Sequence, residues 1–268
     1  MNSSMLTLVK FGGSLITDKT MAYSVRLEIM NRLVDEVKDA VQTNQQLQLV
    51  LANGAGSFAH QSASLYGTEN GFSEKRGRFG YCAVHHDAAR LNSMMIDICI
   101  EKELPVMSLQ PSAMLRTANK RLSHEDFSSV CAAIDAGIIP FLYGDAILDD
   151  TIGSTIYSTD KILHCFVEYV QKHSIMRVNQ IVHVGDYGGV EDGAGQVIPE
   201  ITKRNVKDIT KHLYDTTVVD VTGGMRDKVE EMLAVAKRGV SSCIISGVTE
   251  GNLRACLVGD DFVGTKIY

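Results

Sequence analysis

Two glycine-rich segments hold the residues of this sequence best suited to chemistry. Gly12-Gly13-Ser14 follows the apolar run 5–11, and Gly54-Ala55-Gly56-Ser57 follows the apolar run 47–52. At the end of a parallel strand, glycine lets backbone N–H groups approach phosphate oxygens without a Cβ in the way. One such loop alone is equally typical of a tight turn. Two of them together indicate that two anionic groups bind at one edge of a sheet.

Lysines flank the first of these loops. Lys10 lies inside an apolar run, and burying an ammonium without a partner costs several kcal/mol. We therefore expect Lys10 to point out of the strand end toward an anion. Lys19, a few residues further on, is by itself more typical of a solvated loop. The sequence has no GxxxxGK[ST] motif and no GxGxxG after the first run, so it does not resemble the phosphate-loop NTPases or dinucleotide-binding proteins.

The elements that must position these loops alternate along the chain. Short runs rich in Val, Ile and Leu alternate with segments of helical period, which is typical of an α/β protein with a largely parallel sheet. The sequence predicts strands at 5–11, 47–52, 104–109, 138–143, 181–184 and 243–246, and helices around 30–41, 84–98, 160–173 and 226–238. Without a linker or internal repeat, we expect two closely packed lobes, residues 1–165 and 166–268.

Composition excludes several classes of protein. The 268 residues are 45% hydrophobic and 22% charged, which is typical of an ordered soluble chain, and no apolar run reaches the roughly 18 residues of a membrane span. The N-terminus has no pattern of a secretory signal, so we expect a cytoplasmic protein. A net charge of −6 argues against a nucleic-acid partner. The six cysteines form no CxxC pair, so we expect reduced, mostly buried thiols.

Five motifs spread over the whole chain together resemble those of a known family. They are KFGGSLITDK, NGAGSFAH, GDAILDD, DVTGGMRDK and FVGTKIY. In order and spacing they resemble the amino acid kinase family, and most closely its isopentenyl phosphate kinase branch. The GSFAH segment is the most diagnostic, because family members that phosphorylate a phosphate or phosphonate oxygen have a histidine there, which is His60 in this sequence.

The resemblance implies a fold and a reaction. The fold would be a three-layer α/β/α sandwich with a largely parallel central sheet. The activity would be transfer of a phosphoryl group from ATP, with Mg²⁺, to a small-molecule phosphate monoester. Isopentenyl phosphate is the first expected acceptor. The protein would be a homodimer. Phosphoryl transfer depends mainly on in-line positioning and charge neutralisation, and an ionised acceptor phosphate needs no general base. Lysines, a histidine and backbone amides would therefore suffice.

The resemblance also implies roles for individual residues. The implied catalytic residues are Lys10, Lys19, His60 and Lys228. The implied ATP-binding residues are Lys10, Gly12, Gly13, Ser14, Gly56, Asp186, Gly224 and Lys228. The implied acceptor-binding residues are Gly54, Ala55, His60, Asp145 and Thr159. No residue is expected to ligate a metal directly.

Two segments depart from the family pattern and leave alternatives open. Tyr157-Ser158-Thr159-Asp160-Lys161 resembles the corresponding run of fosfomycin kinases, so a phosphonate is the alternative acceptor. Segment 183–190, HVGDYGGV, keeps Asp186 and Gly189 but loses a threonine and an aspartate of the family pattern. This change predicts altered nucleotide affinity and leaves a non-catalytic nucleotide-binding regulator as a second alternative, although a regulator has no need of the retained lysines. His85-His86-Asp87 favours a surface or acceptor-pocket position over a metal site, because adjacent helical residues diverge.

Overall fold

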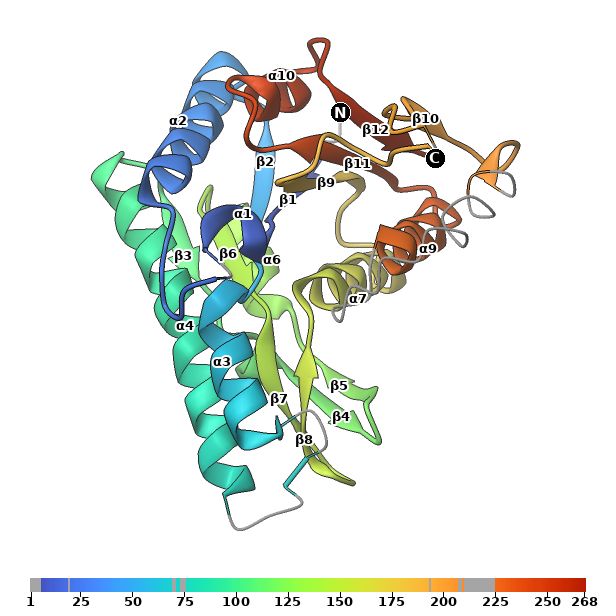
Figure 1. Cartoon of the computed structure of the whole chain (residues 1–268). Helices are drawn as coiled ribbons and strands as arrows, with labels where there is room; N and C mark the ends of the chain where they lie inside the picture. Colours follow the sequence, from blue (N-terminus) through green and yellow to red (C-terminus); the bar gives the residue numbers. More distant parts are fainter. Residues whose placement is uncertain are drawn as a thin grey trace.

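The central element is one eight-stranded sheet (Figure 1). The computed structural model describes residues 6–18, 20–68, 71–72, 76–192, 194–206, 209 and 225–268, with the backbone alone at 226 and 227. The strands lie in the order β10 (Glu200–Ile201), β12 (Gly264–Ile267), β11 (Ser241–Ser246), β9 (Val178–Gly185), β1 (Leu6–Phe11), β2 (Gln48–Asn53), β6 (Ile139–Tyr143) and β3 (Val106–Ser108). Neighbouring strands pair in parallel except β11 with β12, which confirms the predicted, largely parallel sheet.

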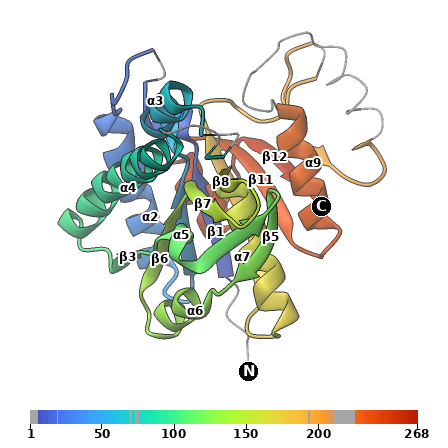
Figure 2. The same cartoon turned by 90° about the horizontal axis from the view of Figure 1, so that it is seen from below.

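Helices cover both faces of this sheet. Successive residues of a strand point to opposite faces, so Val9 and Phe11 of β1 enter one apolar core and Leu6 and Leu8 enter the other. The first core is completed by α1 (Gly13–Ile16), α2 (Leu27–Thr43), α4 (Gly77–Glu101) and α10 (Asn252–Val258), and the opposite face by α6 (Ser128–Asp135), α7 (Thr159–Lys172) and α9 (Met225–Ala236). Helix α3 (Gly56–Tyr66) packs along α4. Figure 2 shows α2 and α4 on one side of the sheet and α7 on the other, which confirms the predicted α/β/α sandwich.

A second, four-stranded sheet extends from the first, toward the bottom of Figure 1. It comprises β5 (Arg121–Glu125), β4 (Leu115–Ala118), β7 (Asp145–Asp149) and β8 (Gly153–Tyr157), preceded by the short helix α5 (Pro111–Met114). Its turns converge on Asp149, whose carboxylate accepts hydrogen bonds from four backbone N–H groups and from Thr117. Hydrophobic periodicity did not predict this sheet, because its strands are short and β5 is largely exposed.

Several element boundaries differ from the predictions. The predicted strand 104–109 is β3, shortened to three residues because Leu104 N–H turns back to the carbonyl of Cys99 at the end of α4. The predicted strand 181–184 is the longer β9, central in the sheet and paired on both sides. Helix α7 continues through the expected lobe boundary at 165–166, and strands from both segments share the large sheet.

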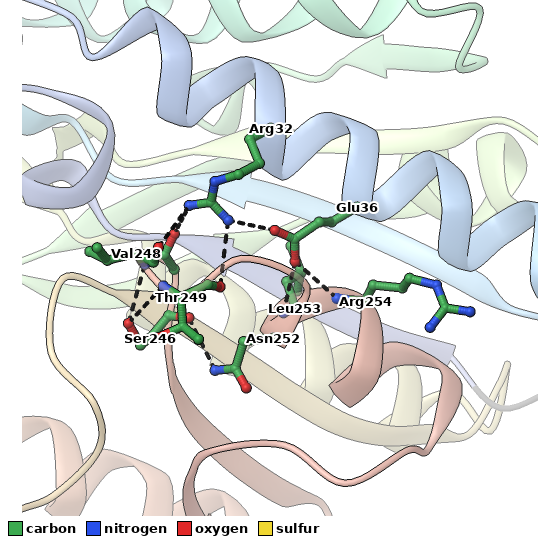
Figure 3. A network of polar contacts seen from close by, with 9 residues as sticks. Arg32, Glu36, Ser246, Val248, Thr249, Asn252, Leu253 and Arg254 are labelled. Carbon is green, nitrogen blue, oxygen red and sulfur yellow. Dashed lines mark hydrogen bonds and ion pairs between the residues drawn. The ribbon is translucent and has the colours of Figure 1, made fainter.

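A polar network fixes the end of β11 against α2 (Figure 3). The buried carboxylate of Glu36 accepts from Leu253 N (3.0 Å) and from Arg254 N (3.2 Å). Arg32 donates to Glu36 Oε1 at 2.5 Å and to the carbonyl of Gly247. Since Gly247 N also donates to the last residue of β9 at 2.7 Å, this network holds the carboxyl ends of β9 and β11 in register.

Candidate functional site

The two glycine-rich loops meet at the carboxyl ends of β1 and β2. A Cβ on Gly13 would lie 2.4 Å from the backbone N of Gly56, and a Cβ on Gly54 would lie 2.9 Å from the backbone N of Gly13. Gly56 also has a left-handed φ of +53°, which L side chains rarely adopt. Ala55 has ordinary right-handed dihedrals and needs no glycine. Glycine is therefore required because the two backbones touch.

Thr17 ties the two loops together. Its buried hydroxyl donates to the carbonyl of Gly13 at 2.7 Å and accepts from the backbone N–H of Ser57 at 2.9 Å. The first contact closes helix α1 and the second holds the first turn of α3. The helix that follows each glycine loop is thus fixed relative to the other, so their N-terminal amides form one rigid surface.

Lys10 lies at this surface and pairs with Asp160. Its ammonium Nζ is 2.8 Å from Asp160 Oδ2, and both side chains are almost fully buried. Burial disfavours both charges, but the pairing outweighs it: the pKa of Asp160 lies far below its usual value and that of Lys10 lies above. Lys10 was expected to face an anion, and the anion in the structure is this carboxylate. Asp160 lies in the first turn of helix α7, after the N-cap residue Ser158, whose Oγ accepts from Lys161 N.

The sequence does not predict Asp160 as a site residue. Its segment differs from the family pattern, and that difference points only to Thr159. The signal was nevertheless present, because a lysine inside an apolar strand demands a buried counter-charge, and an acidic residue in the first turn of a helix is well placed to supply one. Distance in sequence concealed the pair, since 150 residues separate the two partners.

Segment 183–190 lines the other side of Lys10. Ser14 Oγ donates to Asp186 Oδ1 at 3.2 Å, which joins the first glycine loop to the end of β9. The Tyr187 ring lies against Gly185, where a Cβ would come within 2.4 Å of the ring. Lys228 Nζ, from α9, is 4.9 Å from the centroid of the same ring. Tyr187 also contributes to the raised pKa of Lys10, so the aromatic residue is near both of these implied catalytic lysines.

His60 and Thr159 occupy the side of the site toward β2. His60 is exposed on α3, four residues after Gly56. Thr159 is buried, and its hydroxyl donates to the carbonyl of Asn53 at 2.9 Å, at the end of β2. A Cβ on Gly144 would lie 2.9 Å from that hydroxyl, so this glycine lets the chain after β6 approach the start of α7.

The buried Asp145 pairs with a partly exposed histidine of α4. Its Oδ1 is 2.8 Å from His85 Nδ1, and its Oδ2 accepts from Ser112 N at 3.1 Å. The hydrogen bond to Asp145 raises the pKa of His85 above its usual value, against the opposing effect of burial. The carboxylate of Asp145 thus contacts His85 and the Ser112 N–H, and its implied role in acceptor binding stays a prediction. His86 is exposed, as expected for its place on the helix.

Two predicted site residues, Lys19 and Gly224, lie outside the residues that the structure describes. The remaining implied residues lie around the carboxyl ends of β1, β2, β6 and β9. Among the residues described, no group of three His, Cys, Asp or Glu side chains is placed to hold a metal ion. In the same part of the chain, no helix is long and apolar enough to cross a membrane. All six cysteines are free, and all but Cys82 are buried.

Comparisons with known proteins identify a family for this chain. The amino acid kinase family model matches residues 5–246. The isopentenyl phosphate kinase of Methanothermobacter thermautotrophicus is 31% identical, covering 98% of this chain and 98% of its own length. That of Methanocaldococcus jannaschii is 29% identical over the same shares. The chain therefore belongs to the amino acid kinase family.

Solved structures show the same fold. An X-ray structure of an isopentenyl phosphate kinase superposes with a TM-score of 0.81 at 26% sequence identity, covering 98% of this chain and 100% of that chain. An N-acetylglutamate synthase from Neisseria gonorrhoeae superposes with a TM-score of 0.72 at 14% identity over 59% of its chain. The second likeness concerns the fold alone.

Proposed function

We propose that this protein is an ATP-dependent kinase that transfers the γ-phosphoryl group to the phosphate of isopentenyl phosphate. The observation that carries the proposal is the backbone contact between the two glycine loops, with Lys10 beside it. Two loops that touch can present amides to two phosphates at once, and a lysine beside them can neutralise the charge on the group in transfer. The similarity to two isopentenyl phosphate kinases over nearly the whole chain supports the choice of acceptor.

The nucleotide would bind between the first loop and the C-terminal segment 166–268. Amides of Gly13 and Ser14 would hold its phosphates, and Lys228 would approach them from α9. The Gly12 N–H already donates to the carbonyl of Val184 at 2.8 Å, so Gly12 would shape the loop and not bind through its amide. Tyr187 now lies against Lys228, so nucleotide phosphates would compete with the ring for that ammonium. Because the phosphates are the stronger partner for a cation, Lys228 would leave the ring when ATP binds.

The acceptor would bind toward the second loop in segment 1–165. The amide of Gly56 and the start of helix α7 would face its phosphate, since helix N-termini favour anions. The Gly54 N–H already donates to the carbonyl of Phe11 at 2.9 Å, so Gly54 would shape the loop and not bind through its amide. The Thr159 hydroxyl is already bound to Asn53, so this residue would contribute its backbone N–H. His60, exposed on α3, would donate a hydrogen bond to the acceptor phosphate.

Mg²⁺ would travel with the nucleotide. This ion prefers oxygen ligands, keeps several waters and is commonly held by substrate phosphates with one or two carboxylates. The sequence predicts no direct metal ligand and only an ATP-binding role for Asp186. Its carboxylate nevertheless fits this requirement, because it is exposed beside Ser14 at the proposed phosphate site. The bound Mg²⁺ would neutralise phosphate charge, while Lys10 and the loop amides hold the transferring group in line.

Measurement of ADP release tests the proposal. Purified protein is assayed with ATP, Mg²⁺ and, separately, isopentenyl phosphate, dimethylallyl phosphate or fosfomycin. We expect the highest kcat/KM with isopentenyl phosphate. Efficient turnover of fosfomycin with isopentenyl phosphate untouched would support a phosphonate kinase, and inactivity toward every acceptor with intact ATP binding would support a nucleotide-binding regulator.

The assignment of His60 has its own test. His60→Ala should raise the acceptor KM or lower kcat while leaving the affinity for a non-hydrolysable ATP analogue within about twofold, and His60→Gln, which keeps a donor, should retain part of the activity. His86→Ala, an exposed histidine on the neighbouring helix, is the matched control. If His60→Ala lost binding of the ATP analogue but kept acceptor binding, His60 would lie on the nucleotide side of the site, and the assignment of the two sides would be wrong.

A further inference from the structure

Two histidines, His183, which is buried, and His164, which is partly buried, lie near the Lys10–Asp160 pair and have no part in the function proposed above. His183 lies beside Lys10 in the sheet, paired with it in the parallel register of β9 and β1. Its side chain is 3% exposed, and its Nδ1 is 3.2 Å from Asp160 Oδ1. His164 follows Asp160 by one helical turn on α7. The Nε2 atoms of both histidines and the Oδ1 atom of Asp160 are buried without a well-aligned hydrogen-bond partner, so His183 Nδ1 is within reach of Oδ1 but not yet aligned with it.

Asp160 is thus approached by two nitrogens, one at each carboxylate oxygen. Lys10 Nζ lies at Oδ2, and His183 Nδ1 lies at Oδ1. During phosphoryl transfer, however, Lys10 must also neutralise the transferring group, so phosphate and carboxylate compete for one ammonium. A buried carboxylate that loses its partner costs several kcal/mol. Without a second donor, this cost would oppose the movement of Lys10.

Resting on the proposed kinase function, we propose that His183 is a positioning residue: its ring turns slightly to donate from Nδ1 to the unpartnered Oδ1 of Asp160, and so keeps that carboxylate charged and in place while Lys10 turns to the transferring phosphate. Lys10 remains the residue that contacts the phosphate. His183 acts through Asp160, and its contribution is to lower the cost of releasing the lysine.

The charges around His183 favour the neutral, donating form that this role needs. The groups that face it are Lys10 from β1, Asp160 and His164 from α7, and Lys228 from α9. Burial lowers the pKa of His183, the two lysines lower it further, and Asp160 opposes them without reversing the result. The ring is therefore neutral at pH 7. Its one proton belongs on Nδ1, because the other tautomer would set a lone pair against the carboxylate.

The sequence marks the same residue. His183 begins the HVGDYGGV segment, which departs from the family pattern. An apolar residue at a fully buried position of a central strand would avoid the cost of an unpartnered Nε2. The histidine therefore requires a compensating contact, and Asp160 is the carboxylate within reach.

The test compares His183→Leu, which removes the donor, with His183→Asn, whose amide can still donate to Asp160. We expect His183→Leu to lower kcat at least tenfold with both KM values within about threefold, and His183→Asn to recover most of kcat. Circular dichroism and the melting temperature establish that both variants fold. Equal losses of kcat in the two variants, or full activity in His183→Leu, would overturn the inference in favour of a packing role.

Two further measurements separate this inference from the proposed function. In a double-mutant cycle, His183→Leu should have little further effect on kcat in an Asp160→Asn background, because both act on one pair; additive losses would contradict the mechanism. Nitrogen-15 NMR of the histidine rings, recorded without acceptor, should show His183 neutral at pH 7 with its proton on Nδ1. If the wild-type protein showed this signal but phosphorylated no acceptor, the kinase function would be refuted. If it were active but had the proton on Nε2, the role of His183 would be refuted.

Discussion

His164 makes the stability of this protein depend on pH in a way the structure quantifies. Its ring is largely buried on α7, and burial, the nearby His183 and Arg238 lower its pKa from 6.5 to about 4 against a smaller opposing effect of Asp160. In the unfolded chain the same ring takes up a proton near pH 6.5. Below that pH the unfolded state therefore binds more protons than the folded state, and the free energy of unfolding falls.

The magnitude follows from the two pKa values. A pKa unit corresponds to about 1.4 kcal/mol, so moving from 6.5 to about 4 is worth on the order of 3 kcal/mol in full. By pH 5 roughly 2 kcal/mol of this would be lost, and the loss would level off below pH 4. Asp160 affects the free energy of unfolding at lower pH. Its pKa is depressed in the folded state, so the stability that it contributes is lost only as the pH falls below the usual carboxylate range.

The assay is urea denaturation at pH 7.5 and pH 5.0. His164→Leu, which replaces an unpartnered polar atom with an apolar side chain, should leave the free energy of unfolding at pH 7.5 within about 1 kcal/mol of wild type. Between the two pH values it should lose about 2 kcal/mol less than wild type does. The control is His124→Gln, at an exposed position of β5, which should behave as wild type. An unchanged pH dependence in His164→Leu would refute the reasoning.

Three other substitutions test the site itself. Lys10→Ala should lower kcat on the order of a hundredfold or more with the fold intact, which circular dichroism and steady-state kinetics would check; a rise in KM alone would mean that Lys10 supplies only uniform binding. Gly13→Ala should force the loops apart at the Gly56 amide, lowering the free energy of unfolding by about 1–3 kcal/mol and abolishing most activity, whereas a fully active variant would contradict the required contact. Thr159→Val keeps the backbone N–H but loses the hydrogen bond to Asn53, so the free energy of unfolding measured with urea should fall by about 1 kcal/mol. The acceptor KM should change less than threefold. A tenfold rise in that KM would mean that the hydroxyl itself contacts the acceptor.

The parts of the fold that periodicity could predict are those with long apolar faces. The apolar spacing through 30–41 and 84–98 falls on α2 and α4, and the runs at 5–11 and 47–52 fall on β1 and β2. The sheet of β4, β5, β7 and β8 escaped prediction, because strands of four or five residues with polar side chains give too short a pattern. Turn chemistry centred on Asp149 holds this sheet together instead.

The glycine loops of the site could be predicted, whereas its buried charges could not. Glycine after an apolar run is a local signal, and the structure adds the reason for it, a backbone contact between the two loops. Lys10 on β1 is far in sequence from Asp160 and His183, which lie on the consecutive elements α7 and β9. Strand order and the start of α7 bring the three together. A single sequence predicts that Lys10 needs an anion but contains no local pattern that identifies which one.

The central claim is that the paired loops bring ATP and a phosphate monoester together, and phosphorus-31 NMR of the reaction tests it most directly. With wild-type protein, ATP, Mg²⁺ and isopentenyl phosphate, we predict that the monoester signal is replaced by the two coupled signals of a diphosphate while ADP accumulates in equal amount, and that Lys10→Ala slows this conversion on the order of a hundredfold. An unchanged monoester signal, or ADP released with inorganic phosphate in place of the diphosphate, would contradict the account.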